Sequence, residues 1–324
     1  MNAYYENDFN TVARRVNNVN GVIVGRDTVV AGKLSSLLNL GSSGEILDLG
    51  CGNGSFLHTF SSLMPGWGVT GYDVGDSLRG KVEEDSRVTF YSGPNGLDHL
   101  NGKLFDLITL NHVVEHLIEP VNVLSAAAKM LKPNGHIAII IPCFKYVHAD
   151  FFIMDHCSHY TEETLANTIS LSGLTITSKI DGLSAIEIGF IAKKSEKNGA
   201  ESTIRPADIE KIRDEALRCL SWAKGIPDFI IKNARPGSKV GIFGVGGTGM
   251  WLGAYMHDHI GFYVDDDVMK QELGFAGLPV LSVAAIPEGA QVFVPFNTPD
   301  SGLKMAERLK ALCDKAVFIP IPKA

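Results

Sequence analysis

Apolar and polar residues follow one another in blocks that predict alternating helices and strands. Residues 28–40 place valines and leucines at helical spacing, and residues 45–49 form a short apolar run typical of a buried parallel strand. The pattern predicts further helices at 54–63, 119–131 and 161–172, and further strands at 68–72, 87–91, 104–110, 136–141, 174–180 and 185–192. Alternation of this kind indicates a doubly wound α/β fold, with a mostly parallel sheet. The last two strands have no helix between them, which predicts an antiparallel hairpin at the sheet edge.

A second alternating system begins after a charged, apolar-poor break at residues 193–205. The pattern predicts an amphipathic helix at 206–233, strands at 238–243, 260–264, 291–295 and 316–320, and helices at 248–257 and 300–312. We therefore predict a first α/β domain at 1–195, a linker and helical connection at 196–236, and a smaller Rossmann-like α/β domain at 237–324.

Composition and charge narrow the range of functions. The chain has 324 residues, of which 45% are hydrophobic, and 29 basic against 36 acidic residues give a net charge of −7. Because no basic tract is present, we expect no nucleic-acid partner. No apolar run approaches the roughly 20 residues that span a bilayer, so we expect no membrane association. Five cysteines without a CxxC pair favour the reducing cytoplasm.

The first of two glycine clusters follows the predicted strand at 45–49 and precedes a helix. Residues 48–54 read DLGCGNG, and the next strand ends at Asp73, about 20 residues on. A glycine turn lets a ligand approach the backbone, and a carboxylate at Asp73 can accept hydrogen bonds from both hydroxyls of a ribose. The lysine of a phosphate-binding Walker loop is absent, which disfavours a nucleoside triphosphate.

Four segments resemble, in order, the motifs of class I S-adenosylmethionine-dependent methyltransferases: ILDLGCGNG, GYDV, FDLITLNHVVEHLIEP and LKPNGHIAIIIP. The resemblance covers roughly residues 28–192. It implies S-adenosylmethionine as cofactor, a methionine pocket at the glycine loop, a ribose on Asp73 and Asn111 beside the methionine. The implied cofactor-binding residues are Asp48, Gly50, Cys51, Gly52, Asn53, Gly54, Asp73, Val74, Ser92, Gly93 and Asn111. Many members carry an acid near the adenine where this chain has Ser92 and Gly93, so backbone groups or Asn95 are expected to replace it.

His112, Glu115 and His116 follow the strand at 104–110 with a spacing that lets them share a helical face. This spacing suits a metal ion, and the segment resembles the one that supplies metal ligands in ubiquinone-pathway O-methyltransferases, with a histidine in place of the first acid. However, a Glu-His pair at this place is widespread in the superfamily and often structural. We therefore predict no metal ligands.

Residues 143–160 are rich in aromatic residues and histidines, a composition typical of an acceptor site. The stretch DHCSHYTEETL resembles the general-base region of deoxysugar C-methyltransferases and places His156 on the base, although the nearby tyrosine and the cysteine-rich zinc region of that family are absent. The alternatives are an ordered loop histidine and a zinc site with Cys157. The predicted catalytic residues are His156, His112 and His159, and the predicted substrate-binding residues are Tyr146, His148 and Tyr160.

The second glycine cluster, GVGGTG at 244–249, fits the dinucleotide-binding pattern, and Asp265 ends the strand after it. By itself it would indicate an NAD-dependent enzyme, but no later domain carries a hydride acceptor. The following VDDD and GFAGLPVL segments resemble the C-terminal domain of sugar C-methyltransferases. We thus predict a cytoplasmic methyltransferase for a small molecule such as a sugar or nucleotide-linked sugar, compatible with a homo-oligomer. The alternatives are an NAD-dependent enzyme and a non-catalytic nucleotide-binding module.

Overall fold

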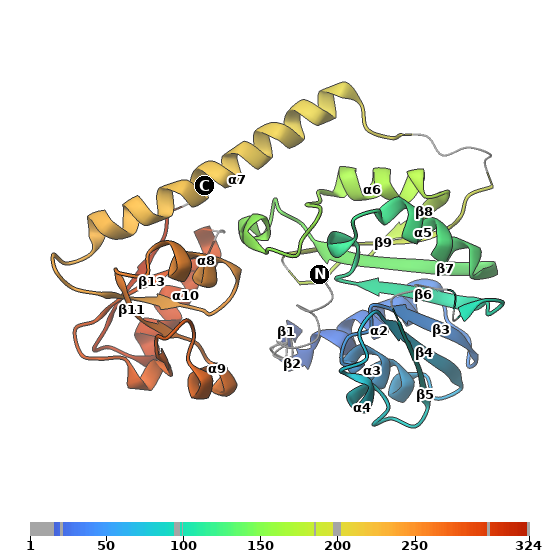
Figure 1. Cartoon of the computed structure of the whole chain (residues 1–324), viewed down its shortest axis with the longest axis horizontal. Coiled ribbons are helices and arrows are strands. Elements are labelled where there is room, and N and C mark those ends of the chain that lie inside the picture. Colours follow the sequence, from blue (N-terminus) through green and yellow to red (C-terminus); the bar gives the residue numbers. More distant parts are fainter. Residues whose placement is uncertain are drawn as a thin grey trace. The chain divides into compact units, whose positions relative to one another are not determined.

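The computed structural model divides the chain into two compact units (Figure 1). The first contains Met1–Cys143 and His156–Asp208, and the second contains Phe144–Asp155 and Ile209–Ala324. The structure describes residues 16–19, 22–93, 98, 100–184, 186–196, 202–296 and 299–322. Asn95, a candidate for the adenine side of the cofactor site, lies outside these ranges. Within them, no helix combines the length and the apolar composition that crossing a bilayer requires.

The first unit is built on a seven-stranded sheet with the order β5-β4-β3-β6-β7-β9-β8. Its strands are β3 (Gly44–Leu49), β4 (Trp67–Asp73), β5 (Val88–Ser92), β6 (Phe105–Asn111), β7 (Leu131–Pro142), β8 (Leu174–Lys179) and β9 (Glu187–Lys194). Strands β3 to β7 pair in parallel, whereas β9 pairs antiparallel with both β7 and β8. This arrangement confirms the predicted doubly wound sheet and the hairpin at its edge.

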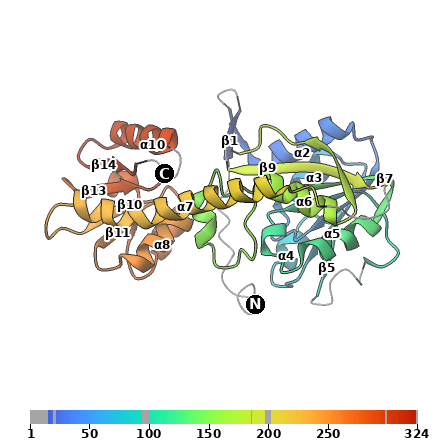
Figure 2. The same ribbon diagram turned by 90° about the horizontal axis from the view of Figure 1, so that it is seen from above.

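Helices cover both faces of this sheet because both faces are apolar (Figure 2). The helices are α2 (Arg26–Leu38), α3 (Ser55–Leu63), α4 (Arg79–Val82), α5 (Pro120–Lys129) and α6 (Glu162–Leu171). Leu34 of α2 and Phe60 of α3 belong to one buried cluster, and Leu124 of α5 and Leu165 of α6 belong to the other. Burial of one such side chain stabilises the fold by about 1.5–3 kcal/mol. A short antiparallel hairpin of β1 (Val16–Val19) and β2 (Val22–Gly25) was not predicted.

The second unit has a five-stranded parallel sheet with the order β12-β11-β10-β13-β14. Its elements are α7 (Pro206–Asn233), β10 (Val240–Phe243), α8 (Gly247–Tyr255), β11 (Ile260–Val264), α9 (Val268–Leu273), β12 (Val280–Leu281), β13 (Gln291–Val294), α10 (Pro299–Leu312) and β14 (Val317–Pro320). The sequence predicted a second α/β system here, and the parallel sheet confirms it. Strand β12 was missed because two residues are too short for an alternating pattern.

Candidate functional site

The glycine loop after β3 requires glycine at several positions. Gly50, Gly52 and Gly54 have φ angles of 71°, 53° and 77°, a region that side chains disfavour. A Cβ atom on Gly50 would also lie 2.5 Å from Cγ2 of Val113. The backbone N–H of Gly50 donates to the Tyr72 carbonyl at 2.7 Å, which ties the loop to β4. The loop thus presents a backbone surface, without side chains at these three positions, at the N-terminus of α3.

Asp73 ends β4 and turns its carboxylate toward this loop. One oxygen accepts the Gly52 N–H at 2.9 Å, and the other accepts the Gly75 N–H at 3.2 Å. Two backbone donors hold the carboxylate in one orientation, and each oxygen keeps a second lone pair for a ligand hydroxyl. This is the geometry that a ribose-binding acid needs.

The segment at the end of β5 carries no acidic residue of its own, but the fold brings the acid Asp76 next to it. The Ser92 hydroxyl donates to Asp76, which follows β4, and Arg79 donates to the Ser92 oxygen at 3.1 Å. The neighbouring Gly93 carbonyl accepts the Tyr72 hydroxyl at 2.6 Å. Asp76 was not among the predicted site residues, and only the fold brings it to Ser92.

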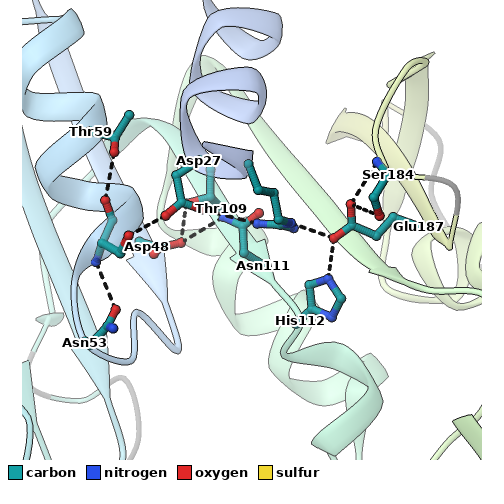
Figure 3. A network of polar contacts seen from close by, with 11 residues as sticks. Asp27, Asp48, Asn53, Thr59, Thr109, Asn111, His112, Ser184 and Glu187 are labelled. Atoms are coloured by element: carbon teal, nitrogen blue, oxygen red, sulfur yellow. Dashed lines mark hydrogen bonds and ion pairs between the residues drawn. The ribbon is translucent and has the colours of Figure 1, made fainter. Parts of the chain in front are cut away.

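Asp48 is a buried carboxyl group near the end of β3, just before the glycine loop (Figure 3). The Thr109 hydroxyl donates to it at 2.5 Å, and the Asn111 amide nitrogen lies 3.5 Å from the same oxygen. Burial raises the pKa of Asp48 to about 7 despite these two hydrogen bonds, and the nearby charges of Asp27 and Asp73 add to the rise. A cationic ligand beside this group would favour its charged form.

His112 follows β6 directly and lies between the carboxylates of Glu187 and Glu115, and Figure 3 shows its contact with Glu187. It has a φ angle of 55°, uncommon for a residue with a side chain. Its Nε2 atom lies 2.5 Å from Glu187, and its Nδ1 atom lies 3.3 Å from Glu115. Glu187 also accepts a hydrogen bond from Arg26 at 2.6 Å. Burial alone would raise the pKa of Glu187, but His112, Arg26 and Ser184 together hold it well below its ordinary value.

The histidine-rich segment at 143–160 divides between the two units. His156 and His159 lie in the first unit with their ring centroids 6.4 Å apart. The His156 ring also packs edge-to-face against the His116 ring, with the centroids 4.7 Å apart. Tyr160 belongs to the buried core of that unit, at 4% exposure.

The predicted substrate-binding residues Tyr146 and His148 lie in the second unit. His148 is buried against Trp222, with the ring centroids 5.1 Å apart, whereas Tyr146 is 37% exposed. Phe152 stacks on Trp251 at 4.5 Å and keeps this short segment on the second unit. The sequence suggested one continuous acceptor segment, and the structure distributes its residues over two units.

The second glycine cluster repeats the geometry of the first with one difference. Asp265 accepts the Val245 N–H at 2.8 Å, as Asp73 accepts an N–H from its own glycine loop. However, the Lys270 ammonium lies 3.1 Å from the same Asp265 oxygen and also donates to the Val245 carbonyl. Two donors therefore already occupy this Asp265 oxygen, whereas each Asp73 oxygen accepts one backbone N–H, so the two clusters are not equivalent.

Residues 25–179 match a family model described as a methyltransferase domain. This range contains the glycine loop, Asp73, Asn111 and the His116–His156 pair. Residues 25–179 are therefore a methyltransferase domain. The methyltransferase domain includes the predicted cofactor-binding residues.

Curated relatives of the methyltransferase domain are ubiquinone biosynthesis O-methyltransferases. The protein from Photobacterium profundum is 31% identical over 99 residues, which are 29% of this chain and 41% of the relative. The protein from Vibrio atlanticus has the same identity and coverage. The chain thus spans about two fifths of the length of these relatives.

Solved structures of methyltransferases are similar at lower identity. An S-adenosylmethionine-dependent methyltransferase from Clostridium acetobutylicum has a TM-score of 0.42 and 16% identity, covering 52% of this chain and 90% of that chain. The plantazolicin methyltransferase BpumL has a TM-score of 0.46 and 15% identity, covering 53% of this chain and 85% of that chain.

Proposed function

We propose that the protein transfers a methyl group from S-adenosylmethionine to a small-molecule acceptor, with a histidine as general base. The acceptor class we propose is a sugar or nucleotide-linked sugar. The donor supplies an electrophilic methyl group on a sulfonium. The chain must then bind the donor, align the acceptor and remove the acceptor's proton.

One observation carries the donor assignment: two buried polar atoms of the methyltransferase domain lack hydrogen-bond partners among the described residues. They are Nη2 of Arg26, a donor, and Oδ1 of Asn111, an acceptor. Buried polar groups without hydrogen bonds are costly and uncommon in native proteins. The carboxylate of the methionine moiety would satisfy Arg26, and its ammonium would satisfy Asn111. With the ribose on Asp73, these residues match the functional groups of the donor.

The donor's affinity is expected to depend on pH through Asp48. Burial raises the pKa of this carboxyl to about 7, so most of the ligand-free protein carries it uncharged at about pH 6. Because a cationic donor stabilises the charged form, binding releases a proton, and affinity increases as the pH rises. The association constant should grow roughly fivefold between about pH 6 and about pH 7 by titration calorimetry. In the Asp48→Asn variant this increase should vanish. If the association constant of the variant still rises with pH as in the wild type, Asp48 is not the group responsible.

The histidines that suit proton removal are His156 and His159. His112 contacts a carboxylate through each ring nitrogen, which suits an anchoring role. His156 and His159 lie together in the segment that resembles the general-base region of deoxysugar C-methyltransferases. The same resemblance, with that of the C-terminal unit, supports a sugar-like acceptor.

Ligand titration separates the proposed function from its alternatives. We expect S-adenosylmethionine and its demethylated product to bind with one site per chain, and NADH fluorescence to be unaffected by the protein. Incubation with nucleotide sugars should yield a product heavier by one methylene group. NADH binding without donor binding would favour an NAD-dependent enzyme. A donor that binds but is never consumed across a broad acceptor panel would favour a non-catalytic module. The contact between Lys270 and Asp265 argues against the NAD-dependent enzyme.

A further inference from the structure

Glu115 is a buried carboxylate whose hydrogen-bonding capacity is unused. It lies in the short 3-10 helix at Val114–His116 and is 1% exposed. Neither side-chain oxygen has a hydrogen-bond partner among the described residues, and the contact at 3.3 Å to His112 is an ion pair only if that histidine is protonated. A buried carboxyl group whose oxygens make no hydrogen bonds loses the favourable interactions it had with water, which costs about 1–3 kcal/mol or more. The position of Glu115 therefore requires an explanation.

Two imidazoles lie next to this carboxylate. His116 is the following residue, and His156 comes from the segment after β7, 40 positions later in the sequence. Their rings are nearly perpendicular, at 88°. One ligand atom from each of Glu115, His116 and His156 lies within 4.8 Å of the other two. The three side chains thus surround one point inside the methyltransferase domain.

We propose that Glu115, His116 and His156 bind one divalent transition-metal ion of the zinc or cobalt class. Two imidazole nitrogens and one carboxylate form a common donor set for such ions, whereas calcium and magnesium prefer oxygen alone. Bond lengths of about 2.0–2.2 Å place neighbouring ligand atoms about 3.4 Å apart in a tetrahedral site. Because the ligand atoms already lie within 4.8 Å of one another, each pair needs to approach by about 1.4 Å at most.

This site differs from the one that the sequence spacing suggested. The spacing grouped His112 with Glu115 and His116, but Glu187 holds His112 at 2.5 Å. The third ligand is His156, which no local pattern could connect to the other two. The prediction of no metal ligands rested on the local segment, and the inferred site depends on the long-range contact.

Three protein ligands leave a coordination position open, as in catalytic zinc sites. A metal there would lower the pKa of a bound acceptor hydroxyl. His159, whose ring centroid is 6.4 Å from that of His156, would be the remaining base for the proton. This catalytic role rests on the proposed function, whereas metal binding itself does not.

The test measures metal binding by the full-length protein after dialysis against a chelator. Addition of Co²⁺ should produce visible d–d absorption that saturates at one ion per chain, and Zn²⁺ should displace it. Loss of a second-shell partner typically weakens metal binding 10–100-fold, so Glu115→Gln and His156→Ala should each weaken it at least as much. His136→Ala is the matched control, because this histidine of β7 is outside the group and should leave the affinity unchanged.

Two results would overturn the inference. One is the absence of Co²⁺ absorption and of bound Zn²⁺ at one equivalent. The other is an affinity that Glu115→Gln and His156→Ala leave unchanged in protein whose circular dichroism matches wild type. If the buried Glu115→Gln variant fails to fold, the half-buried His156→Ala variant still decides the outcome. Donor titration on the metal-free wild type is a separate measurement, and its failure would refute the proposed function without affecting the metal result.

Discussion

Replacement of His156 by alanine is expected to reduce turnover by roughly a hundredfold or more and to leave the affinity for S-adenosylmethionine unchanged. The side chain lies in the segment after β7, beside His116 and His159, whereas the donor assignment rests on the glycine loop, Asp73 and Asn111. We expect this result whether His156 acts as a ligand of a catalytic metal or as the general base, because neither role involves donor binding.

Turnover is measured as the rate of S-adenosylhomocysteine formation with an acceptor that the wild-type protein methylates. The dissociation constant of the donor is measured by calorimetry. His136→Ala, on β7 of the same sheet, is the control and should behave as wild type. Near-normal turnover in His156→Ala would show that this histidine takes no part in the reaction. A joint loss of turnover and donor affinity would instead indicate a structural role.

Replacement of Asp73 by alanine is expected to weaken donor binding about 100-fold or more. A hydrogen bond to a charged group contributes about 1.5–3 kcal/mol, and a ribose bound to Asp73 through both hydroxyls would lose two of them. The variant also removes the acceptor of the Gly52 N–H, which loosens the glycine loop. Calorimetric titration with S-adenosylmethionine and its demethylated product gives the loss directly.

The second glycine cluster supplies a matched control for this variant. Asp265 accepts a backbone N–H from its own glycine loop with nearly the same geometry, at 2.8 Å against 2.9 Å. We expect Asp265→Ala to leave donor affinity unchanged. Unchanged affinity in Asp73→Ala would show that the ribose assignment is wrong, and a loss confined to Asp265→Ala would move the donor to the second unit.

Local patterns predicted much of the fold. The strands from β3 to β7 follow from apolar runs that must be buried on both faces, and the pairing of β8 with β9 follows from the absence of a helix between them. The glycine loop was visible because it combines three glycines with an acid on either side of the turn. The short strands β1, β2 and β12 were missed because two to four residues carry too little periodicity.

The groups that surround the site could not be predicted in the same way. Arg26, Glu187 and His112 form one hydrogen-bonded network, yet Arg26 and Glu187 are 161 residues apart in the sequence. Asp76 reaches Ser92 from another strand end, and residues 144–155 belong to the second unit. None of these relations is periodic, so no window along the chain contains them.

The sequence by itself determined the two α/β systems, the glycine loop and Asp73, because hydrophobic periodicity and turn chemistry are properties of neighbouring residues. The tertiary structure alone decided that Lys270 pairs with Asp265, that Glu187 holds His112, and that Glu115, His116 and His156 lie within a few ångströms of one another. The physical reason is that charge pairing and metal ligation act through space over a few ångströms. Chain folding sets those distances, and sequence spacing does not.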